Sequence, residues 1–295
     1  MPAPFSIDVV LTNYNAWDHL EKSVAAFLEF GGDEIRQIIV VDDASPTPKP
    51  AFNWPSRVVL ITNPQNRGYV ASVNIGVGKT TADIVLIFDA DARPLKPFVE
   101  RLRERFTTLP KLGMIGFHTI NSEGARTGNS CPFPSSSDLF LGQALAYKWD
   151  KLVPAKGPAC VFSCAMAVRR EAFMAVKGFD EDFEFLDADI DFSMRLSGAG
   201  YDVLEDDEML AQHEGGGSPQ TVSRRVLRHY RNRYLLLSKH GRLPSRALLK
   251  AVVLPRLVLE WTFLRVFGPL RFPAATLQDK LEGRSKLLTY VANEW

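Results

Sequence analysis

A run of apolar residues over Ile84–Phe88 ends abruptly in two carboxylates, Asp89 and Asp91. The run is β-branched and aromatic throughout, which is typical of a parallel strand covered on both faces. In open α/β sheets, ligands bind beyond the carboxyl ends of such strands. Because Asp89 and Asp91 share one side of an extended chain, they can face one hard cation and a diphosphate. The alternative is a strand that ends in a solvated turn, where Asp is common.

Strands and helices are expected to alternate around this run. Apolar spacing predicts strands at residues 7–11, 35–41, 57–61, 84–88 and 112–118, and helices at 17–30, 68–79 and 96–107. A long loop is expected at 121–138, then a strand at 160–168, helices at 171–176 and 187–196, and an extended segment at 201–204. This alternation predicts an α/β fold with a mostly parallel central sheet flanked by helices.

Charge is distributed unevenly along the 295 residues, although the net charge is only +1. Residues 221–295 contain 15 Lys and Arg against 4 Asp and Glu, whereas the rest of the chain is acidic. We therefore expect an α/β domain over 1–218 and a basic helical region over 219–295. The basic region is expected to meet an anionic partner, which can be a membrane surface, a lipid phosphate or a nucleic acid, or else to neutralise the acidic body within the fold. Few aromatic residues in this region are placed to stack on bases, which argues against a nucleic acid.

The segment 247–270 is apolar and nearly long enough to span a membrane. It carries four charged residues and Pro255, so a membrane-spanning helix is not expected. Its charges fall on about half of the helix surface. That pattern fits a helix lying on a membrane surface or one packed on the body, and the sequence does not decide between the two.

Three cysteines, Cys131, Cys160 and Cys164, form no disulfide framework or zinc motif. They are expected to be small buried thiols in a reducing compartment. The first residues show no basic segment followed by a long apolar run, so no secretory signal is expected. We expect a cytoplasmic protein, peripheral on the inner face of the membrane if its basic region binds there.

Two familiar nucleotide-binding motifs fail on inspection. Gly78-Lys79-Thr80 resembles the end of a phosphate-binding loop, but Val73 stands where that loop needs its first glycine. The dinucleotide fingerprint fails as well, because Thr81 occupies the position of its third glycine. Any nucleotide site must therefore be built differently.

The remaining polar clusters suit a metal-bound nucleotide. Asp42 and Asp43 follow a predicted strand and can accept hydrogen bonds from a base or ribose. Asn66 and Arg67 precede a predicted helix, where phosphate groups are favoured. Asp89 and Asp91 offer the oxygen ligands that Mg²⁺ or Mn²⁺ prefers, and His213 can complete the coordination from a glycine-rich loop.

A second acidic cluster, formed by Asp187, Asp189 and Asp191, stands at the start of a predicted helix. Carboxylates placed together raise one another's pKa, which favours a general base. The alternative is helix capping, because acidic residues are favourable in a first helical turn. His213 also has an alternative, as an ordinary loop residue.

The order of these motifs resembles the bacterial family 2 glycosyltransferases with the glycosyltransferase-A fold, particularly the rhamnosyltransferase-like branch that builds surface polysaccharides. The resemblance covers roughly residues 6–240. Its marks are the segments 9–15, 40–45, 66–68 through 74–76, 89–91, 178–181, 189–191 with Arg195, and 213–218. Each mark is weak alone, and their joint order carries the resemblance.

The resemblance implies a role for each site residue. Thr12, Asn13, Tyr14, Asp42, Asp43, Asn66, Arg67 and Asp89 would bind the nucleotide of a nucleotide-diphosphate sugar. Asp91, Asp89 and His213 would hold the divalent metal. Asp189 would be the catalytic base, which deprotonates an acceptor hydroxyl in an inverting transfer. The acceptor would be a glycan or a lipid-linked saccharide, and no nucleic acid is expected as a partner.

One departure from the family pattern is Ala188, where Glu often precedes the catalytic Asp. The change leaves Asp187 as a rival for the role of base. It is also the feature that favours the alternative of a non-catalytic protein that binds nucleotide sugars or acts as a scaffold, although the retention of Asp89, Asp91, Asp189 and His213 argues against that alternative. A sugar nucleotidyltransferase is a further alternative, although residues 12–15 lack the glycine-rich basic loop that it needs. Five arginines between 224 and 233 are expected to face an acceptor diphosphate or a membrane.

Overall fold

The computed structural model describes residues 5–142, 145–146, 148, 159–215 and 221–295. By its internal contacts the chain divides into two compact units. The first unit comprises Met1–Phe133 and Gly157–Gly217, and the second comprises Pro134–Lys156 and Ser218–Trp295. Segment 134–156 therefore interrupts the first unit in sequence but belongs to the second unit.

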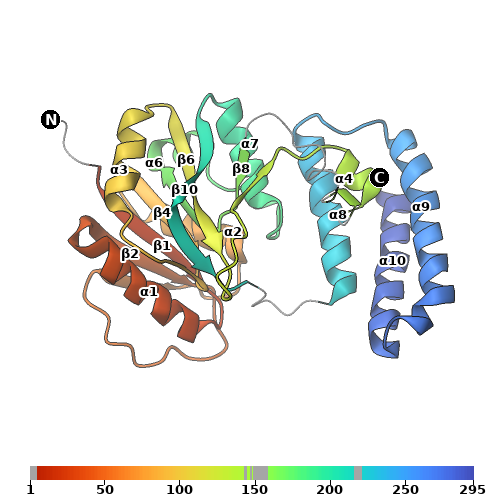
Figure 1. Cartoon of the computed structure of the whole chain (residues 1–295), viewed down its shortest axis with the longest axis horizontal. Coiled ribbons are helices and arrows are strands. Elements are labelled where there is room, and N and C mark those ends of the chain that lie inside the picture. The colour runs from red at the N-terminus through yellow and green to blue at the C-terminus, as the bar shows by residue number, and fades with distance from the viewer. Residues whose placement is uncertain (1–4, 143–144, 147, 149–158, 216–220) are drawn as a thin grey trace. The chain divides into compact units, whose positions relative to one another are not determined.

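An eight-stranded sheet forms the centre of the first unit, with strand order β3-β2-β1-β4-β9-β6-β10-β5 (Figure 1). Its members are β1 (Ile7–Asn13), β2 (Ile35–Asp42), β3 (Val58–Thr62), β4 (Ile84–Asp89), β5 (Ala92–Pro94), β6 (Leu112–Ile120), β9 (Ala165–Arg169) and β10 (Asp202–His213). The β3-β2-β1-β4 half is parallel, as is the β6–β10 pair, whereas β9 and β5 pair antiparallel to their neighbours. The expected mostly parallel α/β sheet is confirmed.

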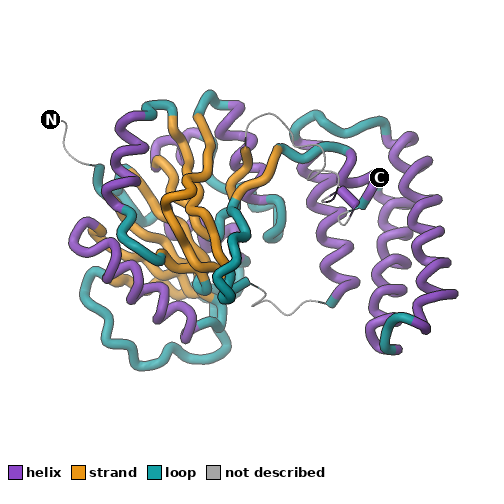
Figure 2. Tube along the Cα trace, in the orientation of Figure 1, coloured by secondary structure: helices purple, strands orange, loops and turns teal. Residues whose placement is uncertain are grey.

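Helices cover both faces of this sheet (Figure 2). They are α1 (Trp17–Gly31), α2 (Tyr69–Gly78), α3 (Val99–Thr108), α6 (Arg170–Ala175) and α7 (Ala188–Gly198), with a 3-10 turn η1 (Gly32–Glu34). α1 and α3 bury apolar side chains against one face, in a core that contains Val9, Leu11 and Phe88. α2 covers the other face. It packs so closely there that a Cβ at Gly76 would clash with the side chain of Val10.

Three details differ from the sequence expectations. The single strand expected over 160–168 is wrong, because β8 (Ala159–Val161) and β9 are separate strands joined by a turn. β8 pairs with β7 (Ser130–Pro132) in a small second sheet, so part of the expected 121–138 loop is a strand. The extended segment at 201–204 is the start of β10, which runs on to His213. The four acidic residues 205–208 conceal this strand in the sequence pattern.

The second unit is helical. It contains α4 (Ser137–Leu141), α8 (Val222–Lys239), α9 (Arg246–Phe267), η2 (Gly268–Leu270) and α10 (Ala274–Glu294). Its core is formed by Leu139, Tyr230, Leu237, Leu249, Val253, Leu257, Leu287, Val291 and Trp295. α10 approaches α8 closely, since a Cβ at Gly283 would lie 2.7 Å from Ser223 Cα. In the described part of the chain, every helix is too short or too polar to cross a membrane.

Candidate active site

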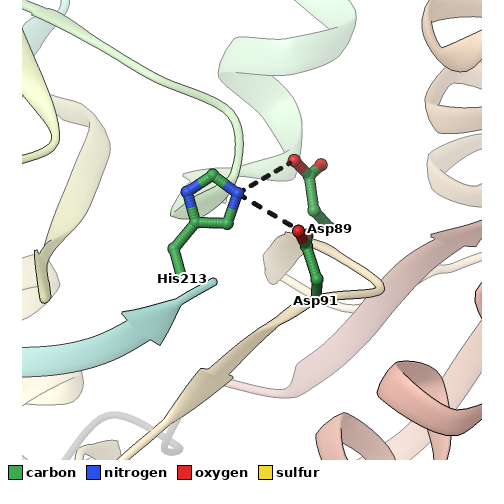
Figure 3. Close-up of side chains that lie close together, drawn as sticks. All are labelled: Asp89, Asp91 and His213. Carbon is green, nitrogen blue, oxygen red and sulfur yellow. Dashed lines mark ion pairs between the residues drawn. The ribbon is translucent and has the colours of Figure 1, made fainter. Parts of the chain in front are cut away.

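Three side chains expected to bind metal meet at the carboxyl end of β4 (Figure 3). Asp89 is the last residue of β4, and Asp91 lies in the turn that leads into β5. β5 pairs antiparallel with the end of β10, which sets His213 opposite Ala92. His213 Nε2 therefore lies 3.5 Å from Asp91 Oδ1 and 3.8 Å from Asp89 Oδ2. The sequence suggested that the two carboxylates lie on one side of an extended chain. In the structure they converge because the chain turns between them.

The charges of the three groups are strongly coupled. Burial raises the pKa of Asp89 to about 6, and the neighbouring Asp91 carboxylate adds to this. Burial also acts on Asp91, but the hydrogen bond and charge of His213 outweigh it and lower the Asp91 pKa. For His213 the effect of burial is overcome by the two carboxylates, so its pKa is raised. The positive charge of a protonated His213 thus partly compensates the negative charges of Asp89 and Asp91.

This arrangement fits a divalent cation. Asp89 Oδ1 is buried and has no hydrogen-bond partner among the described residues. A buried carboxylate oxygen without a partner is destabilising, and a cation would relieve that cost. Two carboxylates and one imidazole also form a donor set that Mg²⁺ or Mn²⁺ accepts.

Asp189 lies in the first turn of α7 and is held by backbone groups. Its Oδ2 accepts the Ser163 N–H at 3.2 Å, and its Oδ1 accepts the N–H of Ile190 at 2.9 Å. Burial raises the pKa of Asp189 to about 7, and the charge of Asp187 contributes in the same direction. A carboxyl group with this pKa can exchange a proton near neutral pH.

Asp187 differs from Asp189 in its backbone and burial. It occupies the N-cap position of α7 in a left-handed conformation, with φ of 66°, and its side chain is only 6% exposed. Such a conformation is uncommon for a residue other than glycine. Asp191, two residues beyond Asp189, accepts a hydrogen bond from Arg195 Nε at 2.7 Å.

The turn at 162–164 connects the acidic groups of β4 with those of α7. Cys164 O accepts the Asp89 N–H at 3.1 Å, and the next residue back, Ser163, donates to Asp189. Tyr69, the first residue of α2, reaches the same turn, with its OH 3.4 Å from Ser163 O. Burial raises the pKa of Tyr69 well above its usual value, and the charge of Asp89 contributes. Sequence reasoning missed Tyr69 and Ser163.

The two carboxylates at the end of β2, Asp42 and Asp43, are buried in separate side-chain hydrogen-bond networks. Asp42 Oδ1 accepts from Asn13 Nδ2 at 2.8 Å and from Ser45 Oγ at 2.5 Å. Asp43 accepts three bonds of 2.8 Å each, from Asn63 Nδ2 and from the backbone N–H groups of Arg67 and Gly68. Asp43 therefore fixes the loop that opens α2, and Asp42 fixes the end of β1.

The remaining predicted donor-site residues lie around these networks. Thr12 stands between Val41 and Asp89 in the sheet, so the β1 end joins the Asp42 network to the acidic pair. Tyr14 is 57% exposed, and Asn66 and Arg67 are exposed as well. Arg67 lies 3.6 Å from Glu181. The sheet order β2-β1-β4 thus gathers these groups along one edge.

This sheet with its acidic edge has the glycosyltransferase-A fold. A mannosyltransferase from Pyrobaculum calidifontis in complex with GDP-Man and Mn²⁺ superposes with a TM-score of 0.60 and 17% sequence identity, covering 99% of this chain and 85% of that one. GalNAc-T7 with UDP, GalNAc and Mn²⁺ superposes with a TM-score of 0.58 and 12% identity, covering all of this chain and 57% of that one.

Sequence comparison narrows the class from this fold to a family. The profile of glycosyl transferase family 2 matches residues 8–176. The chain therefore belongs to glycosyl transferase family 2, as its motifs suggested. An N-acetylglucosaminyl-diphospho-decaprenol L-rhamnosyltransferase of Mycobacterium tuberculosis is 23% identical over 258 residues, which is 79% of this chain and 84% of that protein. The same relative occurs in a second strain of that species.

Proposed function

We propose that this glycosyltransferase moves a sugar from a nucleotide-diphosphate sugar to a hydroxyl group of a lipid-linked saccharide, in the synthesis of a surface polysaccharide. The observation that carries the proposal is that Asp89, Asp91 and His213 meet beside the turn at 162–164. The same turn donates a hydrogen bond to Asp189. The rhamnosyltransferase relative, by its name, acts on a diphospho-decaprenol acceptor. Rhamnose is accordingly the first sugar to test.

The donor would be bound at the edge formed by β2, β1 and β4. In this proposal Asp91, Asp89 and His213 hold a divalent cation, which when bound would neutralise charge on the leaving diphosphate. Asp42 and the end of β1 would contact the nucleoside. Asp43 would act indirectly, by fixing the loop at Arg67 and Gly68. Exposed Arg67 is placed for a phosphate oxygen.

Asp189 would act as the general base. It would accept the proton of the acceptor hydroxyl while the oxygen attacks the anomeric carbon opposite the departing nucleotide, which inverts the configuration. A pKa of about 7 leaves Asp189 ionised in a substantial fraction of molecules at neutral pH. Its bond from the Ser163 N–H holds Oδ2 in place beside the turn at 162–164.

Calorimetric titration with a panel of nucleoside diphosphates, with and without Mn²⁺, tests the donor site. We expect one diphosphate to bind only with Mn²⁺, and Asp91→Asn to abolish that binding. Asp33→Asn is the matched control, since Asp33 is fully exposed and far along the chain from these ligands. A folded protein that binds no diphosphate under either condition would refute a catalytic role and favour the scaffold alternative.

A further inference from the structure

The second unit contains an apolar pocket that the proposed donor site does not use. It encloses about 770 Å³ between α8, α9 and α10, with the end of α4 at its rim. Its walls include Leu141, Leu257, Phe263, Phe267 and Leu287. This volume lies in the range of roughly 300–1,000 Å³ that is typical of small-molecule sites.

One end of this pocket is cationic. Arg256 and Arg284 share a single carboxylate, because Arg256 Nη1 donates to Glu260 Oε1 at 2.6 Å and Arg284 Nε lies 3.5 Å from Glu260 Oε2. Tyr230 takes a second bond from Arg256, at 2.5 Å. The cluster therefore keeps a net positive charge inside a largely apolar wall.

Arg284 lacks acceptors for part of its guanidinium. Its Nη1 atom is buried and has no hydrogen-bond partner among the residues that the structure describes, and its Nε has only the 3.5 Å ion pair with Glu260. Leaving buried donors of a charged group unsatisfied is costly, and an anionic oxygen would satisfy them. The pocket thus combines an apolar cavity with an unfilled requirement for an anion.

The apolar surface continues beyond the pocket along α9. Leu259, Phe263 and Phe267 line the pocket and are also 70%, 57% and 50% exposed. Together with Leu248, Val252 and Val266 they form one exposed apolar stripe on the helix, because the residues from Leu248 to Val266 follow one another at intervals of three, four or seven and so share one side. A long hydrocarbon chain that enters the pocket can continue along this stripe.

We propose that this pocket binds the isoprenoid chain of a polyprenyl-phosphate-linked acceptor, with Arg284 and Arg256 on its phosphate. The proposal rests on the proposed function, since it assigns the acceptor's lipid to the second unit. An alkyl chain with an anionic head matches both the apolar walls and the unpaired guanidinium donors. Neither nucleotide recognition nor a purely apolar partner accounts for both features.

Farnesyl diphosphate is a soluble probe for this site. We expect the full-length protein to bind it saturably in calorimetry with EDTA present, which removes the cation-dependent route to the donor site. Farnesol and inorganic pyrophosphate, which each lack one half of the probe, should bind at least tenfold more weakly. Equal affinity for farnesol would overturn the assignment of Arg284 and Arg256.

Two neighbouring residues of α9 provide a matched pair of variants. Leu259 lines the pocket, whereas Val258 is 50% exposed on the same helix and does not line it. Leu259→Asp should weaken farnesyl diphosphate binding at least tenfold, and Val258→Asp should leave it unchanged. Equal losses in both variants would overturn the pocket assignment, and so would a dimer in light scattering that Leu259→Asp dissociates while probe binding persists.

The donor titration separates failure of this proposal from failure of the proposed function. If a nucleoside diphosphate binds with Mn²⁺ but farnesyl diphosphate does not bind, the lipid site is wrong and the transferase proposal stands. If farnesyl diphosphate binds and no nucleoside diphosphate does, the lipid site stands without the transfer. Binding of the protein to phosphatidylcholine–phosphatidylglycerol vesicles that farnesyl diphosphate fails to reduce would assign the stripe to membranes and overturn the lipid site.

Discussion

The two units of the molecule place their polar groups in opposite ways. In the first, buried carboxylates gather at the ends of adjacent strands, and most of their oxygens are already bonded, as at Asp42 and Asp43. In the second, the cationic pair of Arg256 and Arg284 is set into an apolar wall and retains unpaired donors. The first arrangement suits recognition of a polar donor with fixed geometry. The second suits an amphiphile, because its long chain is bound by non-directional apolar contact and not by directional hydrogen bonds.

Replacing the proposed base should have the largest effect on activity. Asp189→Asn removes the proton acceptor, and general-base contributions are about 10²–10⁴-fold in rate. We expect kcat to fall by that factor, while Mn²⁺-dependent nucleotide binding in calorimetry is unchanged. Asp187→Asn is the matched comparison, and it should retain most of the activity. The reverse result would transfer the role of base to Asp187.

A core substitution in the second unit tests whether its packing can be weakened without loss of nucleotide binding by the first unit. Leu257 is 1% exposed in the core of that unit and also lines the pocket. Leu257→Ala should lower the free energy of unfolding by about 2–5 kcal/mol, as large-to-small core changes do. Denaturation followed by circular dichroism measures this change. Loss of Mn²⁺-dependent nucleotide binding in the folded variant would contradict the division of roles between the units.

The ends of strands explain why part of the candidate site could be predicted. Asp89 and Asp91 were evident because an uninterrupted apolar strand stops at a carboxylate, and strand ends share an edge of the sheet. The fold class followed from the same alternation. The pairing of His213 with β5 could not be read in this way, because the acidic residues 205–208 conceal β10. Its role was inferred from the glycine-rich segment that follows it and from the family resemblance, and not from any predicted strand.

Contacts set by tertiary pairing were beyond the sequence pattern. Tyr69 and Ser163 are 94 residues apart and meet only because β9 pairs with β4 and sets the turn at 162–164 beside α2. The pocket of the second unit was missed for a similar reason. Its lining comes from four segments whose apolar spacing predicts helices but not which faces remain uncovered.

A smaller effect is expected at Asp43, which acts through the loop that opens α2. Asp43→Asn keeps the shape of the side chain but replaces one acceptor oxygen with a donor facing the N–H groups of Arg67 and Gly68. We expect a loss of about 1–3 kcal/mol in the free energy of unfolding and weaker nucleotide binding with unchanged Mn²⁺ stoichiometry. Thermal unfolding and calorimetry provide the two readouts. Unchanged stability would show that the carboxylate is not needed to hold the loop.

The pH dependence of stability gives the most specific test of the acidic site. Because the pKa of Asp189 is raised from 3.8 to about 7, the folded protein holds a proton that the unfolded chain has already released between these values. The stabilising contribution of this group is therefore complete below about pH 4 and is lost as pH rises through 7. Asp189→Asn removes the titration, so the variant should be more stable than the parent at pH 8, by up to about 4 kcal/mol, and equal to it near pH 4. Over the same interval, the activity of the parent should rise with pH, because only the ionised carboxylate accepts a proton.

Stability that increases between pH 5 and 8 in the parent relative to the variant would mean that ionisation of Asp189 does not destabilise the folded protein. Asp189 would then be a charged structural group whose hydrogen bonds stabilise its ionised form. Arg284 of the second unit differs, because one of its buried donors has no hydrogen-bond partner among the described residues.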